Sequence, residues 1–353
     1  MKGWAGAVVA LAAIASGCST APVAAQPTDR IAAPLAPQAP EGSPVARHGA
    51  LSVRDGKIVD AHGQPVTLRG MSLFWSQWGP QYYARDTIDW LARDWQVDVV
   101  RAAIAAEGND GARQHFEREF AKASTVIDAA VANGLYVVVD WHQHHAFPDD
   151  AVRFLTAIAR KYGDLPNLIY EPWKEPLRDG VYWSRDVKPY HLRVVGAIRE
   201  IDPDNLVIAG SPSWSQDVDI AAADPLPFTN LAYTLHYYAG THGQELRDKA
   251  DIALGKGVAL LVTEFGTVNA NGDGPLAREE SQRWWDWAEG NCIGWMAWSI
   301  GDRDESSAAL RPGTPPAGWN AQDLTESGTL LRQKLREARA RNPACQPTQA
   351  SLR

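Results

Sequence analysis

Charged, histidine and aromatic residues stand at or just after the ends of short apolar runs in this chain. They are Arg101, Asp140, His142, Glu171, Glu175, His236, Tyr238, Glu264 and Trp298. Two carboxyl groups can cleave a glycosidic bond, because one protonates the leaving oxygen while the other attacks the anomeric carbon or activates water. Aromatic rings stack on the apolar faces of sugars. These residue types therefore indicate glycoside chemistry, provided that the fold brings the run ends together.

The apolar runs themselves predict the fold. Each is short enough for a buried strand, and the segments between them have helical spacing of apolar residues. Eight runs are found, at 66–71, 97–104, 135–140, 167–171, 206–209, 231–236, 259–264 and 294–299. Strand–helix alternation repeated eight times is typical of a (β/α)8 TIM barrel of the α/β class. A doubly wound open sheet is the alternative, but no glycine-rich phosphate loop follows any run.

Other segments flank or connect these runs. Leu51–Asp60 alternates around an Asp-Gly turn and predicts a short N-terminal β-hairpin. Tyr190–Ile201 places its apolar residues on one helical face and stops before a proline, and Leu331–Ala340 predicts a closing helix. Reacting groups of such a barrel lie at the C-terminal ends of its strands, which is where the residues above stand.

Composition agrees with one large enzyme domain. The chain has 353 residues with 15 Trp, 10 Tyr and 7 Phe, enough apolar area to exclude intrinsic disorder over its whole length. A formal net charge of −8 argues against nucleic acid or an anionic membrane as the main partner. Three Cys are too few for a disulfide scaffold, although Cys292 and Cys345 could pair in an oxidising compartment.

The N-terminus has the features of an export signal. Met1 and Lys2 precede an apolar run over 5–14 that is too short to span a membrane. The run leads to Ala15-Ser16-Gly17-Cys18, which resembles a bacterial lipobox; cleavage after Ala25 is the competing interpretation. We expect a lipoprotein-type signal peptide over 1–18 with a lipid anchor at Cys18. An Ala/Pro-rich linker over 19–47 and a catalytic barrel over 48–345 would follow. The protein would be exported, to the outer membrane or cell surface if lipidated and otherwise to the periplasm or medium.

Three segments at the run ends carry a resemblance to a known family. They are Tyr170–Pro176 (YEPWKEP), Tyr233–Gly243 (YTLHYYAGTHG) and Leu260–Gly266 (LLVTEFG). Together they resemble glycoside hydrolase family 5 (cellulase family A), and more narrowly its bacterial endoglucanase subfamily, subfamily 2. Shorter patterns in the same order, such as Leu68–Ser72 and Trp214–Asp219, extend the resemblance over roughly residues 50–335.

The resemblance implies a retaining mechanism with Glu175 as acid/base and Glu264 as nucleophile. Their carboxyl groups should then lie about 5–5.5 Å apart. Glu175 must hold a proton while Glu264 stays ionised, and Arg101 is the natural positive partner of Glu264. In the family, the tyrosine matching Tyr238 lies beside the nucleophile, and the histidine matching His236 lies near the acid/base.

The same resemblance implies where sugars bind. His142 and Trp298 are expected in the subsite next to the scissile bond, with Trp298 as the stacking platform. Trp78 and Trp214 lie in segments expected to be loops at the active face, where their rings can stack on further sugars.

Three positions depart from the family pattern. Lys174 replaces the Asn that normally precedes the acid/base and bonds the sugar 2-hydroxyl, and a cation there would lower the pKa of Glu175. Phe74 stands where a His is frequent. Arg303 replaces a Lys that usually reaches a distal subsite, with Glu305 retained nearby.

We therefore expect a monomeric, retaining endo-β-1,4-glucanase that hydrolyses internal bonds of cellulose-type glucans without cofactor or metal. His142 and His144 have the spacing of a metal site, but no further ligand pattern supports one. The nearest alternative is the same chemistry on mixed-linkage glucan, glucomannan or xyloglucan. A non-catalytic polysaccharide-binding surface protein is the alternative from another class, and the retention of both glutamates argues against it.

Overall fold

The computed structural model describes residues 1–3, 39–341 and 345. Cys18, most of the expected signal peptide and most of the expected linker lie outside these residues. Within the described part, the short helix α1 (Pro44–His48) falls in the segment expected to be linker, and Pro44 and Val45 are buried. Packed structure therefore begins a few residues earlier than the sequence indicates.

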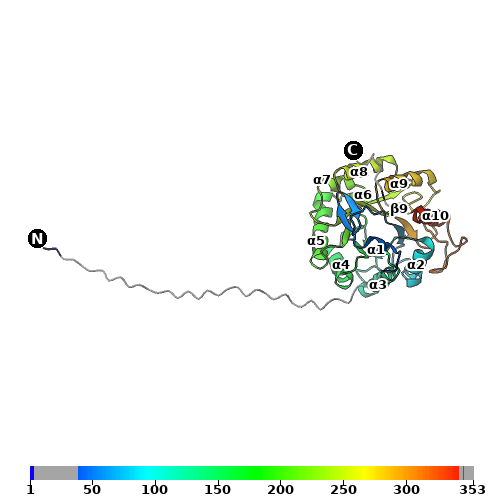
Figure 1. Cartoon of the computed structure of the whole chain (residues 1–353), viewed down its shortest axis with the longest axis horizontal. Coiled ribbons are helices and arrows are strands. Elements are labelled where there is room, and N and C mark those ends of the chain that lie inside the picture. Colours follow the sequence, from blue (N-terminus) through cyan, green and yellow to red (C-terminus); the bar gives the residue numbers. More distant parts are fainter. Residues whose placement is uncertain (4–38, 342–344, 346–353) are drawn as a thin grey trace. The chain divides into compact units, whose positions relative to one another are not determined.

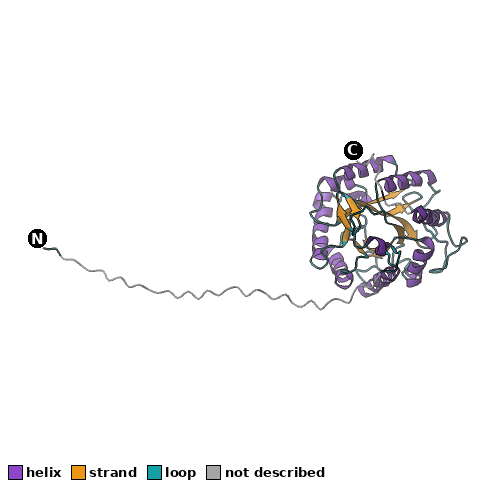
Figure 2. Ribbon diagram, in the orientation of Figure 1, coloured by secondary structure: helices purple, strands orange, loops and turns teal. Residues whose placement is uncertain are grey.

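Eight parallel strands close into a barrel, in the order β10-β3-β4-β5-β6-β7-β8-β9. They are β3 (Arg69–Leu73), β4 (Val99–Ala105), β5 (Tyr136–His142), β6 (Leu168–Glu171), β7 (Leu206–Ala209), β8 (Leu231–Tyr238), β9 (Leu260–Gly266) and β10 (Trp295–Ile300). Each overlaps one of the eight predicted runs, so the predicted TIM barrel is confirmed. Figure 2 shows these strands at the centre of the domain.

The strands are buried on both sides, as parallel strands covered by helices must be. Every residue of β4 and β5 is buried, and the two strands pair over seven successive positions from Val99↔Tyr136 to Ala105↔His142. Continuous apolar runs thus became strands, and the polar residues within them point into the barrel or to its end. The site residues come from this second group.

Helices surround the strands (Figure 1). After α1 come α2 (Arg85–Trp90), α3 (Phe116–Asn133), α4 (Pro148–Tyr162), α5 (Lys188–Arg199), α6 (Pro212–Ser215), α7 (Val218–Ala223), α8 (Gln244–Gly255), α9 (Arg278–Gly290) and α10 (Glu326–Arg341). Shorter turns of other helix types occupy Pro80–Tyr82, Leu91–Trp95 and Trp183–Val187. α5 and α10 confirm the two predicted helices, within a few residues at each end. None of the described helices is long and apolar enough to span a membrane.

The predicted hairpin is also present, as β1 (Ser52–Arg54) and β2 (Lys57–Val59) joined at Asp55-Gly56. Both turn residues have positive φ, 49° and 69°, as a two-residue hairpin turn of this kind requires. Lys57 Nζ donates to the carbonyl of Asn291 at 2.8 Å, which ties the hairpin to the segment that leads into β10.

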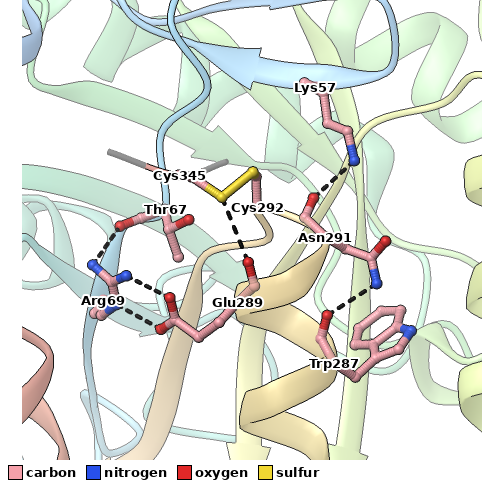
Figure 3. The surroundings of a disulfide bond; sticks show 8 residues. All are labelled: Lys57, Thr67, Arg69, Trp287, Glu289, Asn291, Cys292 and Cys345. Carbon is pink, nitrogen blue, oxygen red and sulfur yellow. Dashed lines mark hydrogen bonds and ion pairs between the residues drawn. A yellow bond between two sulfur atoms is a disulfide. The ribbon is translucent and has the colours of Figure 1, made fainter. Parts of the chain in front are cut away.

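A disulfide joins Cys292, just before β10, to Cys345, beyond α10 (Figure 3). The two cysteines are 53 residues apart in sequence, with a Cα–Cα distance of 5.6 Å. Beside the bridge, Arg69 of β3 makes a two-pronged ion pair with Glu289 of α9 at 2.5 and 2.7 Å. The bridge therefore fixes the end of the closing helix against the barrel.

Replacing both bridge cysteines with serine should lower the free energy of unfolding by about 2–4 kcal/mol, because the unfolded chain regains the entropy that a long closed loop removes. The double variant is used so that no unpaired thiol of the bridge remains. Urea unfolding of oxidised wild type and the double variant measures the difference. Indistinguishable midpoints and slopes would contradict this prediction.

Candidate active site

A cleft of about 670 Å³ opens among the residues that follow the carboxyl ends of the strands. Its lining includes most of the expected site residues together with several from the loops: Phe74, Trp75, His144, Lys174, Glu175, Arg178, Trp214, Gln216, His236, Tyr238, Thr241, His242, Glu264, Ala270, Asn271, Gly272, Trp298, Glu305 and Ser307. The barrel therefore gathers residues from across the sequence at one end, as its topology predicts.

Arg101 of β4 is the buried centre of charge beneath this cleft. Its guanidinium lies 2.7 Å from Glu171, 2.8 Å from Asp140 and 3.1 Å from Glu264. Burial raises the pKa of Glu171, but Arg101 and His236 outweigh it and lower that pKa to about 2. Burial raises the pKa of Asp140 well above its usual range. One arginine thus orients three carboxyl groups, and the pairing with Glu264 agrees with the sequence-based expectation.

Glu175, in the loop after β6, and Glu264, in β9, face each other across the cleft floor. Oxygens of both, together with a nitrogen of His236, lie within 4.8 Å of one another. Retaining glycosidases hold their carboxyl groups about 5–5.5 Å apart, whereas inverting enzymes need a larger gap for a water molecule. The spacing therefore fits a direct attack by one carboxylate on the sugar.

β8 supplies a partner for each glutamate. His236 Nδ1 lies 2.8 Å from Glu175 Oε1, and its Nε2 lies 2.8 Å from Thr263 Oγ1. Tyr238 donates its hydroxyl to Glu264 Oε1 at 3.0 Å. His236 and Tyr238 are two residues apart on a strand, so their side chains project on the same side. This arrangement is the one expected from the sequence.

Lys174 lies in the cleft floor, between the two glutamates. Its Nζ is 2.9 Å from Glu175 Oε2 and 3.7 Å from Glu264 Oε2, and its side chain is only 5% exposed. The ammonium also lies 5.4 and 5.5 Å from the ring centres of Trp75 and Trp298, within range of a cation–π attraction. A cation near both carboxylates thus occupies the position where the family resemblance implies asparagine.

The charges around Glu175 favour its ionised form. Burial raises its pKa, but Lys174, His144 and His236 outweigh burial and hold the pKa well below the usual range. Burial lowers the pKa of Lys174, yet the two glutamates raise it above its ordinary value. In the free protein, therefore, Glu175 is a carboxylate and Lys174 an ammonium.

We expect Lys174→Asn to move the basic limb of the pH–activity profile upward by about one pH unit. Without the ammonium the pKa of Glu175 rises, so the protonated acid survives to higher pH. Initial rates on a soluble glucan between pH 4 and 9 measure the shift. Lys256→Asn, at the exposed end of α8, is the control. A basic limb that coincides with wild type would show that Lys174 does not set the acidity of Glu175.

A left-handed turn in α6 fixes the loop that carries Glu175. Ser213, Trp214 and Ser215 have φ values of 57°, 57° and 59°, a conformation that costs side-chain-bearing residues about 1–2 kcal/mol each. The turn donates backbone hydrogen bonds from Ser213 and Trp214 to the carbonyls of Leu177 and Pro176. Ser215 Oγ donates to the carbonyl of Lys174 at 2.7 Å. Backbone strain at the end of β7 is therefore offset by contacts that position the catalytic loop.

His142 lies beneath the cleft, and it is not among the residues that line it. Its ring stacks on Trp298 at 5.3 Å and meets Trp75 edge-on at 4.1 Å, while its Nδ1 contacts Asp140 Oδ2 at 2.5 Å. The ring is fully buried because β5 continues as far as His142 and holds it between these aromatics. Its Nε2 is buried and has no hydrogen-bond partner among the described residues.

The remaining aromatic and charged residues are spread along the cleft. Trp298 and Trp214 line it, and Trp214 is 36% exposed with Arg178 5.3 Å from its ring centre. Trp78 is 55% exposed and packs 5.1 Å from Trp75, outside the lining set. Both rings can still meet a long chain, because extended polysaccharides run beyond a single pocket.

Two charged residues of the loop after β10 differ in placement. Glu305 lines the cleft, accepts a hydrogen bond from Ser307 at 2.9 Å, and has a pKa raised by burial. Arg303 is exposed, with its guanidinium 6.0 Å from the ring of Phe74. Of these two residues, Glu305 lines the cleft and Arg303 does not.

His144 and Glu107 were missed as site residues by the sequence analysis. His144 Nε2 lies 3.3 Å from Glu175 Oε2, and its Nδ1 lies 2.8 Å from Glu107 Oε1. The sequence signal is the run His142-Gln143-His144-His145. β5 ends at His142, and the chain then turns so that His144 contacts Glu175. Strand spacing alone could not reveal this.

One carboxylate oxygen each from Glu175 and Glu264 and one ring nitrogen of His236 lie close enough together to hold a metal ion. The ammonium of Lys174, however, already lies against both carboxylates, at 2.9 and 3.7 Å. A second cation at that point would be repelled by it. This donor set therefore fits an internal ion pair better than a metal centre.

Comparison with known proteins identifies the family. A model of "Cellulase (glycosyl hydrolase family 5)" matches residues 59–304. Endoglucanase Z of Dickeya dadantii is 45% identical over 80% of this chain and 65% of its own length; Endoglucanase N of Pectobacterium atrosepticum is 40% identical over 83% and 67%. The chain thus spans about two thirds of these relatives.

Solved structures agree with that match. One from Cytophaga hutchinsonii has a TM-score of 0.83 at 44% identity and covers 85% of this chain and 98% of its own. The catalytic domain of Thermobifida fusca endoglucanase Cel5A has a TM-score of 0.79 at 33% identity, covering 84% and 100%. A variant of the latter was solved with cellotetraose. The extent of these matches, and the glutamate pair at the ends of β6 and β9, place this chain in glycosyl hydrolase family 5, the cellulase family.

Proposed function

We propose that this protein is a retaining endo-β-1,4-glucanase, which cleaves internal bonds of cellulose-type glucans. The observation that carries the proposal is the Glu175–Glu264 pair, with carboxyl oxygens within 4.8 Å in an open cleft. The named endoglucanases among its relatives support the substrate class. An open, aromatic-lined cleft suits binding along a chain rather than at its end.

In the proposed first step, the Glu264 carboxylate attacks the anomeric carbon while Glu175 delivers a proton to the leaving glycosidic oxygen. Arg101 and Tyr238, at 3.1 and 3.0 Å, hold Glu264 oriented for that attack. In the second step water attacks the glycosyl ester, and Glu175, now a carboxylate, takes the proton from the water. Configuration is retained because the anomeric centre is inverted twice.

The proposal is tested by the viscosity of carboxymethyl cellulose, with new reducing ends counted in parallel. An endo-acting enzyme lowers the viscosity steeply for few reducing ends, because a cut near the middle of a chain halves its length. Wild type, Glu175→Gln and Glu264→Gln are compared, with Glu279→Gln, on the exposed face of α9, as the matched control. Activity should be lost only in the first two variants.

Other results would redirect the assignment. Weak action on cellulose derivatives with strong action on mixed-linkage glucan, glucomannan or xyloglucan would keep the chemistry and change the substrate. If wild type binds glucan without hydrolysing it, and Lys174→Asn restores hydrolysis, the protein would be a binding protein derived from an enzyme. Inactivity of every variant and wild type on all these glycans would refute the proposed activity.

We also propose that the protein is exported and lipidated at Cys18. The support is the apolar run over 5–14 and the lipobox-like Ala15-Ser16-Gly17-Cys18. Metabolic labelling with a fatty acid in a bacterial host should mark the wild type and not Cys18→Ser. Unlabelled protein whose N-terminus begins at Gln26 would instead indicate ordinary signal-peptide cleavage after Ala25.

A further inference from the structure

A chain of three side chains leads from the rim of the cleft to the acid/base glutamate. Glu107, just after β4, contacts His144 Nδ1 at 2.8 Å and also accepts from the His144 backbone N–H at 3.2 Å. The opposite ring nitrogen of His144 lies 3.3 Å from Glu175 Oε2. His144 therefore bridges two carboxylates through its two nitrogens, an arrangement that fixes the ring orientation.

The backbone builds this chain. The Glu175 N–H donates to the carbonyl of Gln143 at 3.4 Å, and Trp173 Nε1 donates to the carbonyl of His144 at 3.3 Å. The ring of His144 also stacks on Trp75, with centroids 5.7 Å apart. These hydrogen bonds join the loop after β5 to the loop after β6. Together with the stacking on Trp75, they hold His144 beside Glu175.

The charges around His144 favour its protonated form in the free protein. Burial and the ammonium of Lys174 lower the pKa of His144, but its contacts with Glu107 and Glu175 outweigh them and raise the pKa above its usual value. Burial raises the pKa of Glu107, yet the bonds from His144 and His145 lower it to about 2. Glu107 thus remains an anion that stabilises an imidazolium beside Glu175.

This arrangement bears on a difficulty with the proposed function. An acid must carry its proton when substrate arrives, yet the ammonium of Lys174 at 2.9 Å and His236 at 2.8 Å both stabilise the Glu175 carboxylate. The other titratable groups near Glu175 include Glu264 from β9, Tyr238 from β8 and His242 from the loop after β8. Of the two histidines that contact Glu175, His236 is 2% exposed and lies 3.6 Å from the buried Glu171, whereas His144 is 27% exposed and contacts Glu107. His144 is therefore the histidine that can exchange its proton with solvent.

We propose that His144, oriented by Glu107, stores the proton that Glu175 delivers to the substrate. When glucan fills the cleft, water leaves and the ion pair loses solvation, which favours the neutral pair of imidazole and carboxylic acid. The proton moves from His144 Nε2 to Glu175 Oε2 and then to the leaving oxygen as the glycosidic bond breaks. In the second step Glu175 takes a proton from water and returns it to His144, so the protein ends as it began.

His144 is thus a positioning and proton-storing residue that acts through Glu175, and this inference rests on the proposed hydrolase function. It predicts that loss of His144 harms only reactions that need a proton. A phenyl β-cellobioside has a poor leaving group and needs one, whereas a 2,4-dinitrophenyl β-cellobioside does not. The two substrates therefore separate proton delivery from binding and folding.

The experiment compares kcat/KM for both cellobiosides across pH in wild type, His144→Gln and Glu107→Gln. His144→Gln should lower kcat/KM for the phenyl substrate roughly 10²-fold, and that for the dinitrophenyl substrate by less than about threefold. Glu107→Gln keeps the histidine but removes its anion, so the basic limb should move down by about one pH unit. His62→Gln is the matched control, because His62 is exposed in the segment after β2 and does not line the cleft.

Equal losses on both substrates, or an unchanged basic limb in Glu107→Gln, would overturn the inference and leave His144 a structural residue. If wild type cleaves neither cellobioside and no β-glucan, the proposed function fails instead. Imidazole NMR then still tests the pairing: His144 should titrate above the ordinary histidine range in wild type and lower in both Glu107→Gln and Glu175→Gln. No change in that titration would refute the proton store independently of turnover.

Discussion

Glu264→Ala should lower hydrolysis of every β-glucan and aryl cellobioside by at least about 10⁴-fold, the scale on which loss of an essential nucleophile reduces turnover. The loss should be similar for substrates with good and poor leaving groups, because the bond between Glu264 and the anomeric carbon can no longer form. The variant should remain folded, since Arg101 keeps Asp140 and Glu171 at 2.8 and 2.7 Å. Thermal unfolding should show equal or higher stability, because the buried cluster loses one of its like charges.

Added azide distinguishes the roles of the two glutamates. In Glu264→Ala, azide can enter from the side the carboxylate occupied and give the glycosyl azide of inverted configuration. In Glu175→Ala, azide attacks the glycosyl ester on Glu264 and gives the retained product. These products are identified by NMR from a dinitrophenyl cellobioside. The same azide configuration from both variants would contradict the assignment of nucleophile and acid/base.

Arg101→Ala should lower the free energy of unfolding by about 3–5 kcal/mol at neutral pH, because it leaves buried carboxylates without their cation. In wild type the pKa of Glu171 is lowered to about 2, so this pairing contributes stability above the ordinary carboxyl range and loses it as the pH falls toward 2. In the variant, burial raises the carboxyl pKa values, so acid protonates them and removes their repulsion. The difference from wild type should therefore narrow between pH 7 and pH 5.

Urea unfolding at several pH values measures this effect. The control is Arg185→Ala, since Arg185 is 61% exposed in its ion pair with Asp186 and surface pairs of this kind contribute little to stability. Arg101→Lys is a second informative variant, because an ammonium keeps the charge but lacks the planar guanidinium fork that reaches the three carboxyl groups. A loss in Arg101→Ala no larger than in Arg185→Ala would show that the cluster does not depend on its arginine.

The barrel was predictable because its strands are short apolar runs separated by helical segments. β7 coincides with its predicted run, and the other strands differ by a few residues at their ends. Arg101, Glu264, His236 and Tyr238 were also predictable, since each lies on a strand and has a fixed side of it. The topology of the barrel determines the position of residues of this kind. Glu175 follows β6 in a loop, and the family resemblance predicted its role.

The rest of the site depends on loop conformation, which strand periodicity does not specify. His142 was expected in the subsite next to the scissile bond, whereas the structure buries its ring between Trp75 and Trp298. His144 reaches Glu175 only because the chain turns after β5 and Glu107 anchors it from the neighbouring loop. Likewise, the sequence shows that Lys174 is beside Glu175, but only the structure shows its ammonium between both glutamates.

The left-handed turn of Ser213–Ser215 has a consequence for protein engineering. Because its backbone and Ser215 bond the segment 174–177, the loops after β6 and β7 form one exchangeable module rather than two. Segments 172–178 and 211–217 should be transplanted between family members together, so that the donor turn meets the donor loop. A chimaera carrying only one of these segments would combine a strained turn with carbonyl groups that are not placed to accept its hydrogen bonds. The acid/base glutamate would then shift relative to the nucleophile.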